Sequence, residues 1–239
     1  MVRRHVRSEF AADMHVFPGG SVEEDDCSEE ASALCGEPRE DAGAPTREQG
    51  SPALTDLALR LAAIRETFEE TGILLACGKG GEPLLERVGD PSRLSSMRDE
   101  LRRKTVGFTE LLSGEGLRPA VEQLRFFARW ITPEGMPVRF DARFFLAPAP
   151  AGQEARQDNL EVTEHLWVTP AEALRRCREG DFPMLPPTVA NLRELAAFGS
   201  VEEALEGARG REVRAVMPRL LREGGRVRLL LPGDPGYEG

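Results

Sequence analysis

Alternating helical and extended segments predict an α/β fold for this chain of 239 residues. The strongest helical pattern covers residues 55–71, and β-branched and aromatic residues fill two segments at 124–131 and 138–146. Helical patterns both precede and follow these two segments, which is the order of an α/β chain. Hydrophobic residues make up 40% of the sequence, enough for one sizeable core.

The helix at 55–71 has a defined start, buried face and end. Thr55 or Asp56 can cap its first turn. At roughly 100° per residue, four apolar side chains fall within a stripe about 60° wide and should face the core. They are Leu57, Leu61, Ile64 and Phe68. Gly72 is a suitable residue for the position after the helix end, so we expect the helix to stop at Thr71.

The remaining elements follow from shorter patterns. We expect extended pieces at 2–7 and 14–18, an apolar strand at 73–76, a helical insert at 91–113, a strand at 164–168, helices from Thr169-Pro170 and at 187–198, and a terminal hairpin with arms at 213–218 and 227–231. The turn between the two β-rich segments is Thr132-Pro133-Glu134-Gly135.

An acidic segment interrupts the first part of the chain. Residues 23–48 contain ten acidic residues and two arginines, a net charge of −8 out of the total of −10. Large apolar side chains are scarce there, which predicts a disordered insertion over residues 27–54. The rest of the chain is close to neutral, so we expect no nucleic-acid partner.

The sequence also limits where the protein works. No apolar stretch approaches the roughly 18 residues that span a bilayer, and residues 1–20 lack the pattern of a secretory signal. Four scattered cysteines form neither a disulfide framework nor a zinc motif. We therefore expect a cytoplasmic protein with no membrane partner.

Three carboxylates share one ridge of the helix at 55–71. Glu66, Glu69 and Glu70 stand at i, i+3 and i+4, opposite the apolar stripe, where like charges repel. A divalent cation would remove that penalty, and carboxylate oxygens beside an anionic substrate suit Mg²⁺, with Mn²⁺ as the alternative. Arg65 can hold a neighbouring carboxylate by a bidentate contact. A charged, solvated helix face is the competing interpretation.

Together with an upstream glycine turn, the ridge resembles the Nudix box, Gly-x5-Glu-x7-Arg-Glu-U-x-Glu-Glu-x-Gly-U. The matching residues are Phe17-Pro18-Gly19-Gly20 and Arg65-Glu66-Thr67-Phe68-Glu69-Glu70-Thr71-Gly72-Ile73. The resemblance implies an α/β/α sandwich on a mixed sheet, with Glu66, Glu69 and Glu70 as metal ligands and Glu66, Arg65 and Glu70 as the catalytic group. Glu66 is also the candidate general base.

The box departs from the family pattern in two ways. Asp26 stands where the pattern has Glu, and about thirty extra residues precede Arg65. An interrupted box of this kind resembles the Nudix 19-like branch, which implies hydrolysis of coenzyme A or acyl-coenzyme A to 3′,5′-ADP and a 4′-phosphopantetheine product. By this resemblance, residues 1–200 form the Nudix domain and residues 201–239 a C-terminal extension.

Further residues are candidates for substrate binding or for an additional acid. Substrate contacts are assigned to Gly19, Gly20, Arg4, Arg139 and Arg143, and a further carboxylate to Glu161 or Glu164. Phe126, Phe127 and Trp130 could stack an adenine ring, although core packing is the default for strand aromatics. For His15 we favour a structural, hydrogen-bonded role over substrate contact.

Two other functions stay open at this point. The same site could act on ADP-ribose or another nucleotide sugar, or the chain could be a Nudix-fold nucleotide-binding module without turnover. Only Val2-Arg3-Arg4 precedes Arg7-Ser8, so either the first strand is truncated or the sheet lacks an edge strand. A missing strand would leave unpaired backbone groups. Such an edge could pair with a partner, for example a second copy of the chain in a homodimer.

Overall fold

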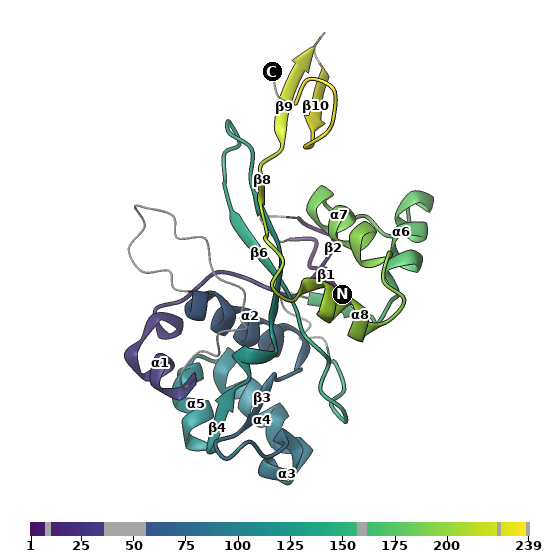
Figure 1. Ribbon diagram of the computed structural model, residues 1–239. Helices are drawn as coiled ribbons and strands as arrows, with labels where there is room; N and C mark the ends of the chain where they lie inside the picture. The colour runs from purple at the N-terminus through teal and green to yellow at the C-terminus, as the bar shows by residue number, and fades with distance from the viewer. Residues whose placement is uncertain (8–10, 36–55, 157–161, 224–225, 238–239) are drawn as a thin grey trace.

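The computed structural model describes residues 1–7, 11–35, 56–156, 162–223 and 226–237. Helices and strands are mixed along the chain, as the predicted α/β class requires (Figure 1). The described helices are α1 Glu29–Cys35, α2 Asp56–Thr71, α3 Leu84–Val88, α4 Pro91–Arg102, α5 Phe108–Gly114, α6 Pro170–Glu179, α7 Pro186–Leu195 and α8 Val201–Ala208, with short 3₁₀ turns η1 Asp25–Cys27 and η2 Val121–Gln123.

The described strands form four short sheets. They are β1 Val2–Arg4, β2 His15–Val16, β3 Ala76–Gly78, β4 Leu117–Pro119, β5 Arg125–Ile131, β6 Asp141–Leu146, β7 Val162–His165, β8 Ala215–Val216, β9 Arg219–Glu223 and β10 Arg226–Leu230. Their orders are β2-β1-β7, β3-β4, β6-β5-β8 and β10-β9. Because β5 pairs antiparallel with β6 and parallel with β8, the mixed sheet predicted for the fold is present.

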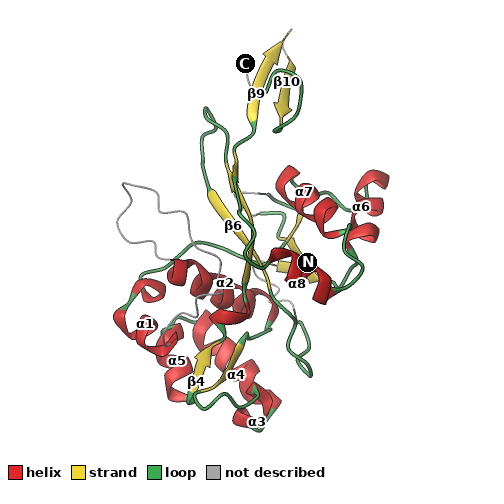
Figure 2. Ribbon diagram, viewed as in Figure 1, coloured by secondary structure: helices red, strands yellow, loops and turns green. Residues whose placement is uncertain are grey.

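Two groups of helices lie on either side of the strands. Figure 1 shows α1 to α5 gathered around β3 and β4, and α6 to α8 grouped on the other side of the long strands β5 and β6. Figure 2 shows the same division by element type, with the β9-β10 pair projecting away from both groups. The layered arrangement expected of a Nudix-type sandwich is therefore confirmed.

The helix that carries the carboxylates folds as its sequence predicts. Leu61, Ile64 and Phe68 are buried in the largest core cluster, which also contains side chains from α1, α4 and α5. The helix ends at Thr71. Gly72 follows with a φ of 76° and donates its N–H to the carbonyl of Phe68. A left-handed residue at this position favours glycine.

The helical insert is confirmed, with Leu94, Met97 and Leu101 of α4 buried in the same cluster. The strand expected at 73–76 forms later, at Ala76–Gly78, where it pairs with β4. A second core cluster contains Phe127, Ala128 and Trp130 of β5 and Ala208 of α8.

The disorder predicted for residues 27–54 is wrong for its first part. Residues 25–35 form η1 and α1, and Ala31 and Cys35 of α1 are buried in the main core. The composition was misleading because small side chains such as these can be buried without any large apolar residue. Residues 36–55 lie outside the described residues.

The two ends of the chain also differ from expectation. β1 is paired on both sides, by β2 and by β7, so the short first strand is the middle strand of its sheet. The arm expected at 213–218 does not form the terminal hairpin. Instead, β8 within it pairs with β5, and the antiparallel partner of β10 is β9. The division into domains at residue 200 stays a prediction.

Candidate active site

The glycine turn after β2 lies directly against the carboxylates of α2. The N–H of Gly19 donates to Oε2 of Glu70 at 3.1 Å. At Gly20 a β-carbon would stand 2.3 Å from Oε1 of Glu66, which is closer than real β-carbon contacts come. Two parts of the chain that are about fifty residues apart therefore meet at this point, and Gly20 is required for their close approach.

Arg65 is the centre of the site. Its side chain is 2% exposed, and it contacts Asp26, Glu66 and Glu69 together. The N···O distances are 2.9 Å to Asp26, 3.0 Å to Glu66 and 3.1 Å to Glu69, and one amino group also donates to the carbonyl of Ser21 at 2.8 Å. Burial by itself lowers the pKa of Arg65, but the hydrogen bonds and charges of these carboxylates outweigh it and raise the pKa overall.

Asp26 links the segment before the acidic insertion to the helix after it. The carboxylate is buried, accepts from Arg65 and also accepts from the backbone N–H of Glu23 at 2.8 Å. Asp26 occupies the position where the box pattern has Glu. Because η1 brings it to α2, the shorter side chain reaches the same arginine, and the two halves of the interrupted box are joined.

The three carboxylates of the ridge are not equivalent. The side chains of Glu66 and Glu69 are 15% and 26% exposed, whereas Glu70 is only 3% exposed. Glu70 turns toward Gly19, a contact that helical spacing cannot reveal. The ridge predicted as one open face therefore divides into two outer carboxylates and one buried carboxylate.

The donor set suits a divalent cation, but it does not form a closed cage. Within the described ranges, no three or more side chains of ligand type are grouped so that they could hold a metal ion as they stand. Mg²⁺ usually takes one or two protein carboxylates and completes its shell with water and substrate phosphates. Glu66 and Glu69, both partly exposed, fit that kind of open site.

Arg98 of α4 supports the end of the same helix and was not predicted from the sequence. Its Nε donates to the carbonyl of Glu69 at 2.9 Å, and its guanidinium lies 3.4 Å from the position of a β-carbon at Gly72. A cation at the carbonyl end of a helix offsets the helix dipole. The only sequence signal was its place beside Met97 in an amphipathic segment.

Comparison with known proteins identifies the family. Residues 1–195 match the family described as NUDT19 Nudix domain. The chain belongs to the Nudix hydrolases. It is 32% identical to the acyl-coenzyme A diphosphatase NUDT19 of Gallus gallus, in an alignment covering 99% of this chain and 71% of that protein. It is 28% identical to the protein of the same name from Homo sapiens, with the same coverage.

A solved structure agrees with this assignment. The crystal structure of a NUDIX hydrolase from Alicyclobacillus acidocaldarius matches with a TM-score of 0.62 and 30% identity, covering 86% of each chain. The Nudix box predicted from the sequence is thus found in a chain of the Nudix family, and the helix α1 lies between its two halves.

The candidate substrate residues of this Nudix chain lie in different environments. Arg143 contacts Asp141 at 3.3 Å, and Arg139 is exposed and donates to the carbonyl of Thr132. Arg4 lies on β1, and its buried Nε has no hydrogen-bond partner in the described structure.

Of the two candidate acids, Glu164 is part of the described structure. Glu164 is half-exposed on β7, with its carboxylate 4.0 Å from Arg3. Glu161 lies outside the described residues. The fourth carboxylate of the site stays a prediction.

The aromatic and histidine candidates are mostly structural. Phe127 is buried in the second core cluster, and buried Trp130 donates its indole N–H to Asn191 at 3.2 Å. His15 is buried and stacks on Phe182 with 3.5 Å between ring centroids. Burial lowers the pKa of His15, which favours its neutral form. Burial and stacking agree with a structural role for these residues. The hydrogen bond expected of His15 is missing at its Nδ1, which is buried without a partner among the described residues.

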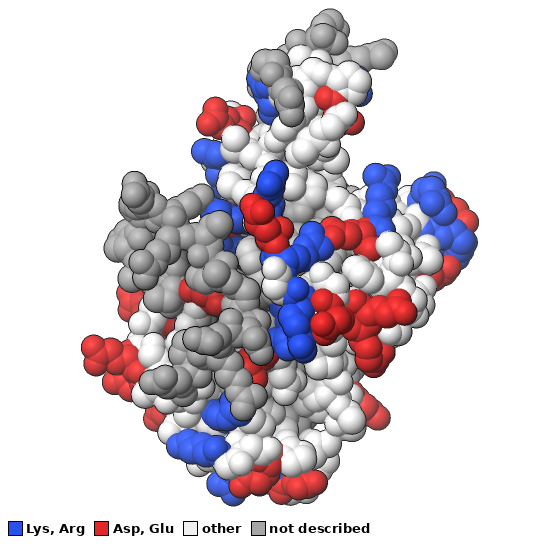
Figure 3. Space-filling view, in the orientation of Figure 1, with Lys and Arg blue, Asp and Glu red and all other residues white. Residues whose placement is uncertain are grey.

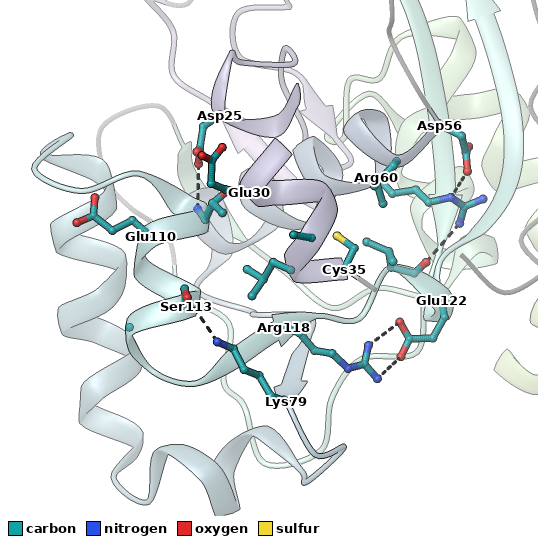
Figure 4. Close-up of a pocket in the computed structure, with 16 residues that line it drawn as sticks. Asp25, Glu30, Cys35, Asp56, Arg60, Lys79, Glu110, Ser113, Arg118 and Glu122 are labelled. Carbon is teal, nitrogen blue, oxygen red and sulfur yellow. Dashed lines mark hydrogen bonds and ion pairs between the residues drawn. The ribbon is translucent and has the colours of Figure 1, made fainter. Parts of the chain in front are cut away.

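A pocket of about 1160 Å³ opens beside the start of α2 and is separate from the box carboxylates. Figure 4 shows Arg60 paired with Asp56 and Arg118 paired with Glu122 in its lining. Cys35 also lines it, and burial raises the pKa of that thiol to about 12.

The charges on the surface are likewise mixed. On the face shown in Figure 3, acidic and basic side chains stand next to one another instead of forming a field of one sign. In the described part of the chain, no helix is long and apolar enough to cross a membrane.

Proposed function

We propose that the protein is a Mg²⁺-dependent diphosphatase that cuts coenzyme A or acyl-coenzyme A into 3′,5′-ADP and the corresponding 4′-phosphopantetheine. The observation that carries this is the joined Nudix box, in which Arg65 holds Glu66 and Glu69. In the glycine turn, Gly20 lies against Glu66 and Gly19 donates to Glu70. The curated relatives named above, which are acyl-coenzyme A diphosphatases, support the choice of substrate.

The reaction adds one water across the P–O–P link of the substrate. The water oxygen forms a new bond to one phosphorus, the bond from that phosphorus to the bridging oxygen breaks, and the bridging oxygen leaves with the other phosphate. A Mg²⁺ ion held by Glu66 and Glu69 would bind phosphate oxygens, acidify a water and offset the charge on the leaving phosphate.

The residues of the chain divide the remaining tasks. Glu66 is the proposed general base that accepts the proton of the attacking water. Arg65 is a positioning residue, because its buried guanidinium fixes where the carboxylates of Glu66 and Glu69 stand. The Gly19-Gly20 turn would approach the substrate closely, since it carries no side chain there. Glu70 keeps this turn in place through its bond from Gly19.

A substrate panel tests the proposal. Purified protein with Mg²⁺ is given coenzyme A, an acyl-coenzyme A and ADP-ribose in parallel, and products are identified by liquid chromatography and mass spectrometry. We expect 3′,5′-ADP from the first two. A clear preference for ADP-ribose would replace the substrate while leaving the Nudix chemistry, and cleavage of none would favour the non-catalytic binding module.

The carboxylate assignment has its own test. Glu69→Gln should lower turnover by at least about 100-fold with little change in thermal midpoint, because the side chain is partly exposed. Glu86→Gln, an exposed glutamate on α3, is the matched control. Equal turnover in the two variants would contradict the assignment of Glu69 to the site.

A second experiment identifies the cation. The protein is treated with a chelator, and Mg²⁺ or Mn²⁺ is then added back to find which cation restores activity. The cytoplasmic location and a homodimer remain predictions.

A further inference from the structure

The last turn of α2 carries two of the box carboxylates and packs against α4. The carbonyl of Phe68 accepts from the N–H of Gly72 at 2.8 Å. The next N–H, that of Ile73, donates to the hydroxyl of Thr71 at 3.2 Å and not to the carbonyl of Glu69. The last carbonyls of an α-helix have no partner within the helix, so the carbonyl of Glu69 needs a donor from outside it.

Arg98 of α4 is that donor. Its Nε donates to the carbonyl of Glu69 at 2.9 Å, and the residue is only 7% exposed. Its guanidinium also lies over the helix end, 3.4 Å from the position of a β-carbon at Gly72. Met97, the residue before Arg98, is buried in the same core cluster as Phe68 of α2. The core therefore fixes the helix from which Arg98 reaches the box.

Glu69 is held at two points. Its carboxylate accepts from Arg65 at 3.1 Å, and its backbone carbonyl accepts from Arg98. Arg65 is part of the same helix, whereas Arg98 comes from a different one. Because helix ends fray, a contact from another helix is needed to keep the last turn of α2 in one position. The same turn carries Glu70, which accepts from Gly19 of the glycine turn.

Resting on the metal-dependent activity proposed above, we propose that Arg98 is a positioning residue for the metal site. By holding the last turn of α2, it keeps the carboxylate of Glu69 where a divalent cation can bind it. Residues that orient a metal ligand typically change metal affinity by about 10- to 100-fold when they are replaced. The helical insert thus contributes to the active site through a backbone contact.

Direct binding of Mn²⁺ to the substrate-free protein tests this role. Free Mn²⁺ has a sharp electron paramagnetic resonance signal that is lost on binding. Arg98→Met keeps an unbranched side chain but removes the donor, so it should weaken Mn²⁺ binding by at least about 10-fold. Arg98→Lys retains a donor without the planar guanidinium and should bind with intermediate affinity. Titrations are made well below the thermal midpoint of each variant, so that only folded protein is compared.

The matched control is Arg93→Met on the same helix. Arg93 pairs with Glu100 and Glu115 at 2.6 Å each, and neither partner lies on α2. This replacement can therefore lower the stability of the insert without removing a contact to the box. Its affinity for Mn²⁺ should equal that of the wild type, even where its thermal midpoint is lower.

Turnover gives a second readout. With coenzyme A as substrate, Arg98→Met should need about 10-fold more Mg²⁺ for its half-maximal rate. Its kcat at saturating Mg²⁺ should approach that of the wild type. A merely structural role would instead lower kcat through loss of folded protein and leave the Mg²⁺ requirement unchanged.

The outcomes separate this proposal from the proposed substrate. Unchanged Mn²⁺ affinity in Arg98→Met, or an equal loss in Arg98→Met and Arg93→Met, would overturn it. Should Arg98→Met fail to fold, Arg98→Lys decides the question, and wild-type affinity in that variant overturns the proposal. A wild type that binds Mn²⁺ but does not cut coenzyme A contradicts the proposed function, while the Mn²⁺ titrations still test Arg98. A wild type that binds no Mn²⁺ overturns both.

Discussion

Arg65 partly neutralises the repulsion that its own helix creates. Glu66 and Glu69 would repel each other on an isolated helix, yet each accepts a hydrogen bond from the guanidinium of Arg65. Asp26 binds the same guanidinium from outside the helix. The carboxylates are thereby held in position before a cation binds, and little reorganisation is needed when it does.

Gly20 offers a sharp test of this arrangement. In Gly20→Ala the new β-carbon would stand 2.3 Å from Oε1 of Glu66, so the carboxylate must move and its bond from Arg65 is disturbed. The displaced group is the end of a flexible side chain, so we expect the thermal midpoint to change little. Turnover should fall by about 10- to 100-fold, since a small misplacement at a reacting centre is costly.

The matched control is Gly114→Ala at the end of α5, where a β-carbon would meet no atom within 4 Å. Steady-state kinetics and thermal melts of both variants decide the question. A Gly20→Ala enzyme that turns over as fast as Gly114→Ala would show that the position of Glu66 does not limit the reaction.

At this scale the sequence predicted the residues but not their partners. Helical spacing placed Glu66, Glu69 and Glu70 together and suggested that Arg65 holds a neighbour. It could not show that Glu70 is buried, because its partner is the N–H of Gly19, far away along the chain. It also could not show that Asp26 reaches Arg65, since only the tertiary fold brings η1 to α2.

Among the secondary elements, β5 and β6 formed within the two β-rich segments predicted for them. β6 begins at Asp141, three residues later than the predicted segment 138–146, so the connection after Ile131 is longer than the predicted four-residue turn. Their pairing is reinforced by Arg129, a buried side chain that holds Asp141 with two hydrogen bonds, at 2.9 and 2.7 Å. Composition could suggest strands, whereas this cross-strand pair depends on a register that the sequence alone does not define.

This pair predicts a dependence of stability on pH. The hydrogen bond from Arg129, with the charge of Arg143, holds the pKa of Asp141 below its ordinary value. A carboxyl whose pKa is lowered by folding stabilises the protein above its unfolded pKa of about 3.9. That stabilisation is lost as the pH falls through the folded pKa.

Asp141→Asn should therefore have a lower thermal midpoint than the wild type at pH 7, and the gap should narrow below about pH 4. Melting curves collected from pH 7 to pH 3 give the comparison. Glu172→Gln, an exposed residue paired with Arg175 on α6, is the control for surface ion pairs. A gap that stays constant over this range would show that the Asp141 charge contributes nothing.

In the molecule as a whole, the helices of the predicted inserts pack into the same core as the helix of the Nudix box. The insert helices α4 and α5 share one cluster with α2, and α1 joins them from inside the interrupted box. The β9-β10 pair extends beyond the two helical groups and is continuous with β8 on the edge of the central sheet (Figure 1). The order of helices and strands along the sequence predicted the fold class. The sequence could not show where the inserted segment ends and the core begins, because that depends on which small residues are buried.

This boundary can be tested by replacing parts of the acidic segment and measuring the thermal midpoint. On composition alone, replacing residues 28–50 with a short Gly/Ser linker should leave the thermal midpoint nearly unchanged, because loop closure depends weakly on length. The structure changes that expectation, since the replacement removes α1. Ala31 and Cys35 would no longer fill the main core, and partly buried Leu34 would be lost with them.

We therefore expect the midpoint to fall by at least about 5 °C when residues 28–50 are replaced, at roughly 2–4 °C per kcal/mol for a chain of this size. Replacing residues 38–53 keeps α1 and removes a stretch with no large apolar side chain, so its midpoint should stay close to that of the wild type. Differential scanning fluorimetry of the two replacements beside the wild type makes the comparison. If both midpoints fall equally, the contribution of the inserted segment lies beyond α1. If neither falls, α1 does not stabilise the core.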